Sequence, residues 1–114
     1  MRGSGWICAR GLPDIPLDAA AEFHARIVPD VRQAMARSGD IVICFDPADH
    51  AHKAWRLAAI QNLAREGASG CRVNGLVASS SDLAGTAETR QFLQQAAGVT
   101  GQLLEVAGNG AEKL

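Results

Sequence analysis

The feature that most constrains the fold is a helical segment between two strand-like runs. The runs are Ile41–Phe45 and Arg72–Ala78, and each has the length and apolar content of one buried strand. Between them, residues 46–66 form a helical pattern. It opens with Asp46, a favoured helix-capping residue, and Pro47, which suits the first helical position. This order predicts a β-α-β unit with parallel strands and a right-handed crossover.

The remaining segments extend this unit on both sides. Gly5–Ala9 is predicted to be a short strand, a long helix is expected from Asp18 to about Arg37, and Pro29 predicts a kink inside that helix. The helix has an apolar stripe repeating every four residues: Phe23, Ile27, Val31 and Met35. A helix from about 86 to 97 and a strand over 102–107 follow. The order β-α-β-α-β-α-β predicts one α/β domain, residues 1–114, with a parallel sheet of about four strands.

Charge and hydropathy exclude several classes of protein. Eleven basic and 12 acidic residues leave a formal charge of −1, so no basic surface favours nucleic acid. Unbroken apolar runs reach only about five residues, whereas a membrane helix needs about 20. The first residues, Met1–Gly5, also lack the apolar core of a signal peptide. We therefore expect a cytoplasmic protein that binds neither nucleic acid nor membrane.

Three cysteines bear on the redox compartment. Cys8, Cys44 and Cys71 are odd in number, and each lies in or beside an apolar, strand-like run. A disulfide framework uses an even number of cysteines in a secreted chain. The pattern therefore predicts buried, reduced thiols.

Two stretches carry a resemblance to a known family. The first runs from Lys53-Ala54 through Asn62-Leu63-Ala64-Arg65-Glu66 to Arg72-Val73-Asn74, and the second is Val99–Gly108. In their order and separation they resemble the second half of a short-chain dehydrogenase/reductase (SDR). The resemblance implies a Rossmann-like three-layer sandwich of the NAD(P)-binding superfamily. It identifies a truncated, degenerate member that covers only the family's C-terminal half.

A dinucleotide site is not expected in this chain. Such a site needs a strand, a glycine-rich turn and a helix, because the turn and the helix N-terminus hold the pyrophosphate. Gly3-Ser4-Gly5 is a fragment of this pattern, with no third glycine, preceding strand or following helix. We therefore expect no cofactor, with NAD(P) bound only if a partner supplies the binding half.

The family's catalytic set is a tyrosine, a lysine, a serine and an asparagine, and this chain has no tyrosine. By the resemblance, the four positions hold Asp49, Lys53, Asp46 and Asp30, in that order. An aspartate carboxylate is generally ionised at neutral pH and does not donate a proton as a phenol does. We therefore assign no catalytic residue to these positions, and interpret Asp46 and Asp49 as helix-start residues.

Metal ligands and nucleophiles are the other candidate features of this segment and of the serine run that follows. His50 and His52 are two apart on the expected helix and point about 200° away from each other. Asp49 and His52 share a face, yet two ligands do not make a site, so no metal is expected and these side chains should be exposed. Lys53 would need burial to act as a nucleophile. Ser79–Ser81 lacks the Gly-x-Ser-x-Gly turn of a nucleophilic serine.

Two hypotheses for the function stay open. The first is a catalytically inactive SDR-like protein that forms a homodimer or an accessory subunit of a full-length SDR. An open sheet edge at Gly5–Ala9 favours pairing with a partner. A helix face rich in alanine favours a partner helix, although the same face could equally pack on its own sheet. Its residues are Ala51, Ala54, Ala58 and Ala59. The alternative is a small oxidoreductase-like enzyme or a nucleotide- or acyl-CoA-binding protein, using the crevice at the strand C-termini. Its residues would be Lys53, Asp46, Asp30 and Ser79.

Overall fold

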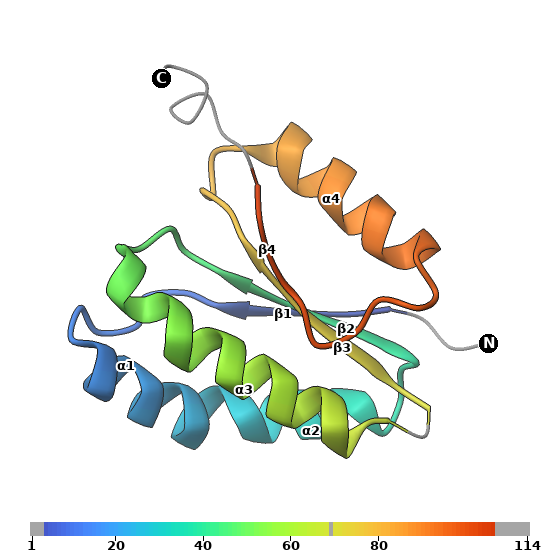
Figure 1. The fold of residues 1–114 in the computed structure, drawn as a ribbon, viewed down its shortest axis with the longest axis horizontal. Coiled ribbons are helices and arrows are strands. Elements are labelled where there is room, and N and C mark those ends of the chain that lie inside the picture. The colour runs from blue at the N-terminus through green and yellow to red at the C-terminus, as the bar shows by residue number, and fades with distance from the viewer. Residues whose placement is uncertain (1–3, 69, 107–114) are drawn as a thin grey trace.

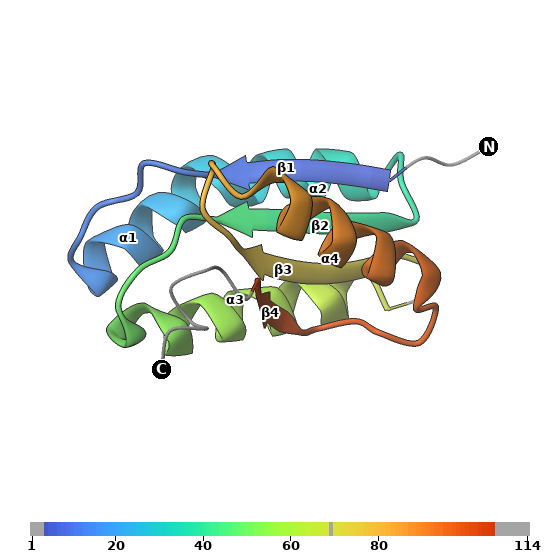
Figure 2. The same ribbon diagram turned by 90° about the horizontal axis from the view of Figure 1, so that it is seen from above.

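The computed structural model describes residues 4–68 and 70–106, and it forms a parallel sheet with helices on both faces (Figure 1). The four strands are β1 (Ser4–Ala9), β2 (Asp40–Phe45), β3 (Arg72–Val77) and β4 (Leu103–Glu105). Their order in space is β1-β2-β3-β4, as Figure 2 shows from above. Every neighbouring pair is parallel. The prediction of a Rossmann-like α/β sandwich with a partial parallel sheet is confirmed.

The helices divide unequally between the two faces. They are α1 (Pro16–Glu22), the π-helical η1 (Phe23–Ile27), α2 (Val28–Met35), the 3₁₀-helical η2 (His50–His52), α3 (Lys53–Glu66) and α4 (Leu83–Gln95). The helices α1, α2 and α3 lie below the sheet in Figure 1, and α4 lies above it. Among the described helices none is long and apolar enough to cross a membrane.

The first long helix is irregular where the proline predicted a kink. Val28 donates its backbone N–H to the carbonyl of Phe23, five residues back, which is the π-helical pattern. Pro29 follows near the start of α2. A wider turn suits this position, because Pro29 has no N–H and its ring would crowd the carbonyl of Ala25 in a regular helix. The expected cap was wrong: the helix begins at Pro16, and Asp18 lies in its first turn.

The start of α3 also differs from the prediction. Asp46 does not cap the helix. Instead, the carboxylate of Asp49 accepts a hydrogen bond of 3.0 Å from the N–H of Ala51, and one 3₁₀ turn leads into α3 at Lys53. The reason lies outside the segment, because the carboxylate of Asp46 is bonded to residues that follow β1.

The last helix begins earlier than expected. Asp82 caps α4 by accepting the N–H of Gly85 at 3.0 Å, so α4 starts at Leu83 and not near residue 86. The side chain of Asp82 thus stabilises a first helical turn in a segment whose polar composition is typical of a loop. Strand β4 is shorter than expected, and residue 107 lies outside the described residues.

Two apolar clusters hold the layers together. The larger one joins β1–β3 to α1–α3 and contains Phe23, Phe45 and the half-buried Trp55, whose rings lie 5.4–5.9 Å apart. The smaller one joins the sheet to α4. Gly75 lets α3 approach β3 closely, because a Cβ atom there would lie 3.1 Å from Ile60 Cδ1 and 2.8 Å from Leu103 Cδ1.

The three cysteines are free in the structure, and their burial differs. Cys44 is buried and Cys71 is half-buried, whereas Cys8 is exposed, so the prediction of a buried thiol was wrong for Cys8. The cause is its position on the outer strand β1, on the sheet face that carries only α4.

Candidate functional site

The carboxyl ends of the parallel strands meet at one edge of the sheet, where α/β folds place their ligands. Arg10 follows β1, Asp46 follows β2 and Ala78 follows β3. The family resemblance also places Asp49 and Lys53 beside this edge, at the start of η2 and α3. The edge is therefore the place to look for chemistry.

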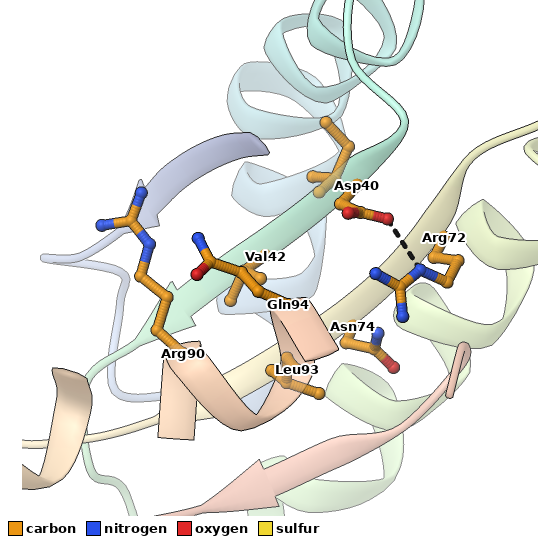
Figure 3. Close-up of a pocket in the computed structure, with 8 residues that line it drawn as sticks. Asp40, Val42, Arg72, Asn74, Arg90, Leu93 and Gln94 are labelled. Carbon is orange, nitrogen blue, oxygen red and sulfur yellow. Dashed lines mark hydrogen bonds and ion pairs between the residues drawn. The ribbon is translucent and has the colours of Figure 1, made fainter. Parts of the chain in front are cut away.

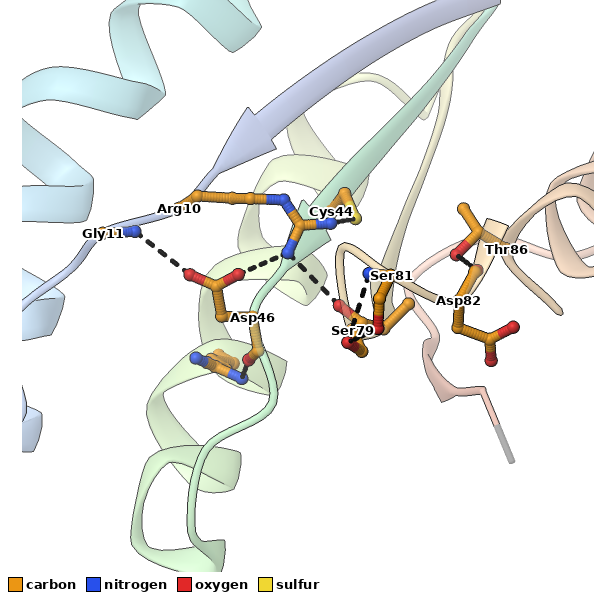
Figure 4. Close-up of polar contacts among 10 residues, drawn as sticks. Arg10, Gly11, Cys44, Asp46, Ser79, Ser81, Asp82 and Thr86 are labelled. Carbon is orange, nitrogen blue, oxygen red and sulfur yellow. Dashed lines mark hydrogen bonds and ion pairs between the residues drawn. The ribbon is translucent and has the colours of Figure 1, made fainter. Parts of the chain in front are cut away.

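Arg10 links the ends of three strands (Figure 4). Its Nη1 donates to Oδ1 of Asp46 and to the carbonyl of Ala78, the latter at 3.2 Å. Its Nη2 donates to Sγ of Cys44 at 3.0 Å. The backbone N–H of Gly11, whose φ is 71°, donates to the second carboxylate oxygen of Asp46 at 3.1 Å. Both carboxylate oxygens of Asp46 are thus engaged within the protein.

These contacts determine the ionisation of Asp46. Burial acts to raise the pKa of this carboxyl group. The hydrogen bonds from Arg10 and Gly11, with the charges of Arg10 and Arg56, outweigh burial and hold the pKa below its ordinary value. At neutral pH Asp46 is a carboxylate in an ion pair and is not available as a proton donor.

Asp49 and Lys53 line a cavity of about 320 Å³ beside this ion pair. The other side chains in its wall include His50, Arg56 and Glu105. Lys53 is exposed, and the carboxylate of Asp49 is used to cap η2. The structure thus brings Asp49 and Lys53 to one cavity, while Asp46 lines a neighbouring cavity of about 150 Å³.

The other two residues named from the sequence lie apart from these cavities. Asp30 is exposed in the first turn of α2 and belongs to the wall of neither cavity. Ser79 is also exposed, and its hydroxyl group lies 2.9 Å from that of Ser81. Four positions that the family resemblance groups into one site are therefore only partly grouped here.

Arg56 lines both cavities, and sequence reasoning missed it. It is only 6% exposed, its Nη1 donates to the carbonyl of Asp46 at 2.9 Å, and its guanidinium lies 4.7 Å from the Phe45 ring centroid. Its Nε is buried without a hydrogen-bond partner among the described residues. Burial lowers its pKa, against the charges of Asp46 and Glu105. The sequence did contain a signal for Arg56: it follows Lys53 by three residues, and this spacing places both side chains on one face of the helix.

His52 is buried, so the prediction of an exposed side chain was wrong for it. Its Nε2 lies 2.8 Å from the carbonyl of Asp14, and Trp55 Nε1 donates to its Nδ1 at 3.1 Å. These bonds fasten the segment before α1 to the start of α3. The described part of the chain contains no group of three or more His, Cys, Asp or Glu side chains placed to hold a metal ion.

A third, very small cavity lies under α4 (Figure 3). Arg72 Nε donates to Asp40 at 2.7 Å, and its Nη1 donates to the carbonyl of Ala96. Asn74 donates to the carbonyl of Val99 at 3.0 Å and accepts the N–H of Gln102 at 3.1 Å. These polar groups bind the connection between α4 and β4, so we interpret this region as structural.

Comparison with known proteins then identifies the family. The family model "SDR-like: Short chain dehydrogenase-like protein" matches residues 7–106. The chain belongs to the SDR-like family. The match runs from β1 past β4, so it includes the whole strand edge of this SDR-like protein, and it confirms the resemblance inferred from the Lys53 and Val99 segments. No curated protein and no solved structure matches the chain.

Proposed function

We propose that this SDR-like protein is a catalytically inactive subunit that pairs with a second copy or with a full-length SDR. One observation carries the proposal: both aspartates at the expected proton-donor and serine positions are engaged in the protein's own structure. Asp46 binds Arg10 and Gly11, and Asp49 caps the turn before Lys53. Carbonyl reduction needs a proton donor free to reach the substrate. A role in assembly needs none.

The outer strand β1 supports an assembly role. Among the described residues β1 pairs only with β2, so its other side presents backbone N–H and C=O groups. Such an edge favours pairing with another strand. A second copy joined at β1 would give a continuous sheet through both chains, and a full-length SDR would offer strands of the same parallel type.

The outward face of α3 and of the preceding turn η2, which contains Ala51, supports the same proposal. Ala51, Ala54 and Ala58 are exposed, whereas Ala59 is buried against the sheet. Small side chains on an exposed face allow the helix of a partner to approach closely. The alternative, that all four alanines serve contact with the sheet, therefore applies to Ala59 only.

The test is the mass of the full chain in solution and of the complex it forms in its native host. We expect either a dimer or a fixed-ratio complex with an SDR, recovered with a tagged chain. Ala58→Arg should reduce that assembly, and Ala87→Arg, at an exposed alanine of α4, should leave it intact. A monomer that recovers no dehydrogenase, or equal effects of the two variants, would refute the proposal.

A second candidate is a nucleotide- or acyl-CoA-binding protein. It is favoured by the 320 Å³ cavity, where two cationic side chains, Lys53 and Arg56, could face a phosphate. Titration with NADH, NADPH and coenzyme A, followed by tryptophan fluorescence, separates the candidates because Trp55 lies on the same helix. Saturation that Lys53→Met removes would favour this second function, and no change up to millimolar ligand would reject it.

A further inference from the structure

The strand register places two cysteines side by side. Cys8 of β1 is the direct partner of Cys44 of β2. Neighbouring strands lie about 4.7–4.9 Å apart, and disulfides join Cα atoms about 4.4–6.8 Å apart. Trp6 and Val42, two residues before each cysteine, both pack on the α4 side. Because strand side chains alternate, the two thiols point to this same face.

The two thiols differ in access. Cys8 is exposed, whereas Cys44 is fully buried. Arg10 Nη2 donates to Cys44 Sγ at 3.0 Å, and the same guanidinium is fixed by Asp46 and by the carbonyl of Ala78 (Figure 4). Burial raises the pKa of the Cys44 thiol, and the charge of Arg10 opposes this rise. A thiol open to reagents thus lies beside a sheltered thiol in contact with a cation.

We propose that Cys8 and Cys44 form a redox pair that a hydroperoxide converts into an intrachain disulfide. This proposal is independent of the assembly role above. The exposed thiol reacts first, and the sheltered one resolves the product. Cys71, which packs with the cluster on the opposite face, takes no part.

The chemistry balances with hydrogen peroxide as the oxidant. The Cys8 sulfur, as thiolate, attacks one peroxide oxygen, the O–O bond breaks, and the leaving hydroxide takes a proton to become water. Cys8 is then a sulfenic acid. The Cys44 sulfur attacks the Cys8 sulfur, the S–O bond breaks, and the second hydroxide leaves as water with the Cys44 proton. Two thiols lose two electrons in total, and the peroxide is reduced to two waters.

Arg10 acts here as a positioning residue for the second step. The thiolate is the attacking form, and a cation beside a cysteine favours it. The guanidinium stays in place during the reaction because Asp46 and Ala78 also hold it. A small shift of β1 relative to β2 brings the two sulfurs to the bond distance of about 2 Å.

The experiment treats the full chain with hydrogen peroxide, counts thiols after denaturation and maps the linked peptides by mass spectrometry. We expect the count to fall from three to one, with Cys8 joined to Cys44 in the same chain and thiol reductant restoring all three. Cys71→Ser is the matched control and should form the same disulfide. In Cys44→Ser, Cys8 should stop at the sulfenic acid, which a dimedone probe traps.

Three results would overturn the proposal. They are a Cys8 sulfinic acid beside an intact Cys44 thiol, a Cys8 link between two chains as the main product, and equal thiol loss in wild type and Cys8→Ser. Arg10→Gln tests the positioning role: closure should slow by about tenfold, because the variant loses the cation that favours the Cys44 thiolate, while sulfenic acid formation keeps its rate. Equal slowing of both steps would refute that role. Loss of the fold in this variant would leave the decision to the Cys44→Ser trapping result.

Discussion

The two faces of the sheet are built in different ways. One face is covered by α1–α3 and holds a cluster of aromatic and branched side chains around Phe23 and Phe45. The other carries only α4, and its smaller cluster of Val42, Leu76, Ala78 and Leu93 is bordered by polar contacts. On that face Arg90 covers the half-buried Trp6 at 4.5 Å from the ring centroid.

The two faces should contribute differently to the stability of the fold and to its reactivity. The three-helix face buries most of the large side chains, so it should supply most of the free energy of folding. The α4 face contains the cysteine pair, Arg10 and the polar groups under α4, whose contribution depends on satisfied hydrogen bonds. The cysteine pair thus lies on the side of the sheet that is less enclosed.

The largest expected effect is at Phe23. Phe23→Ala removes a fully buried ring that contacts Phe45 and Trp55, and it should lower the free energy of unfolding by about 3–5 kcal/mol. Urea unfolding followed by circular dichroism measures it. A decrease of less than 1 kcal/mol in the free energy of unfolding would contradict the claim that this face supplies most of the stability.

Leu93 is the matched position on the α4 face. Leu93→Ala should cost about 2–3 kcal/mol, near the low end for a buried leucine, because Trp6 and Leu104, half-buried side chains that pack against the same cluster, can move into the space. The same urea titration applies. A cost above that of Phe23→Ala would reverse the comparison of the two faces.

Asn74 tests the polar part of the α4 face. Asn74→Leu keeps the branched shape of the side chain but leaves the carbonyl of Val99 and the N–H of Gln102 without their partner, which should cost about 1–3 kcal/mol. Amide hydrogen exchange should rise first in the connection between α4 and β4. Unchanged exchange there would show that the amide of Asn74 does not hold this connection.

The smallest expected effect is at Asp46, whose side chain is 43% exposed. Its folded pKa lies below the unfolded value, so its contribution is complete above about pH 4 and is lost as the pH falls through the folded pKa. Asp46→Asn should therefore cost at most about 1 kcal/mol at pH 7, given solvent screening. The difference from wild type should shrink in urea titrations below pH 4. A difference that grows with acid would contradict the ion pair.

The sequence predicted the elements that depend on local patterns. The continuous apolar run of β2 is typical of a strand buried on both faces, and all of Ile41–Phe45 is buried. Pro29 predicted the irregular turn, because the effect of its ring is confined to residues that are close in the sequence. Local composition suffices to predict such elements.

What the sequence did not predict depends on partners far along the chain. Asp46 has the composition of a helix cap, but its partner Arg10 is 36 residues away. Arg56 is a charged residue at a buried helix position, and the carbonyl of Asp46 and the Phe45 ring make that burial possible. The pairing of Cys8 with Cys44 required the register of β1 against β2, which no single segment contains.

The order of the strands has a consequence for how the protein is made. Each strand lies next to the one synthesised before it, so β1 and β2 can pair as soon as the first helices have left the ribosome. Then β3 adds to β2, and β4 adds to β3, so that no later one of the described strands enters between earlier ones. Across these four strands, synthesis therefore extends the sheet in one direction only, from β1 to β4.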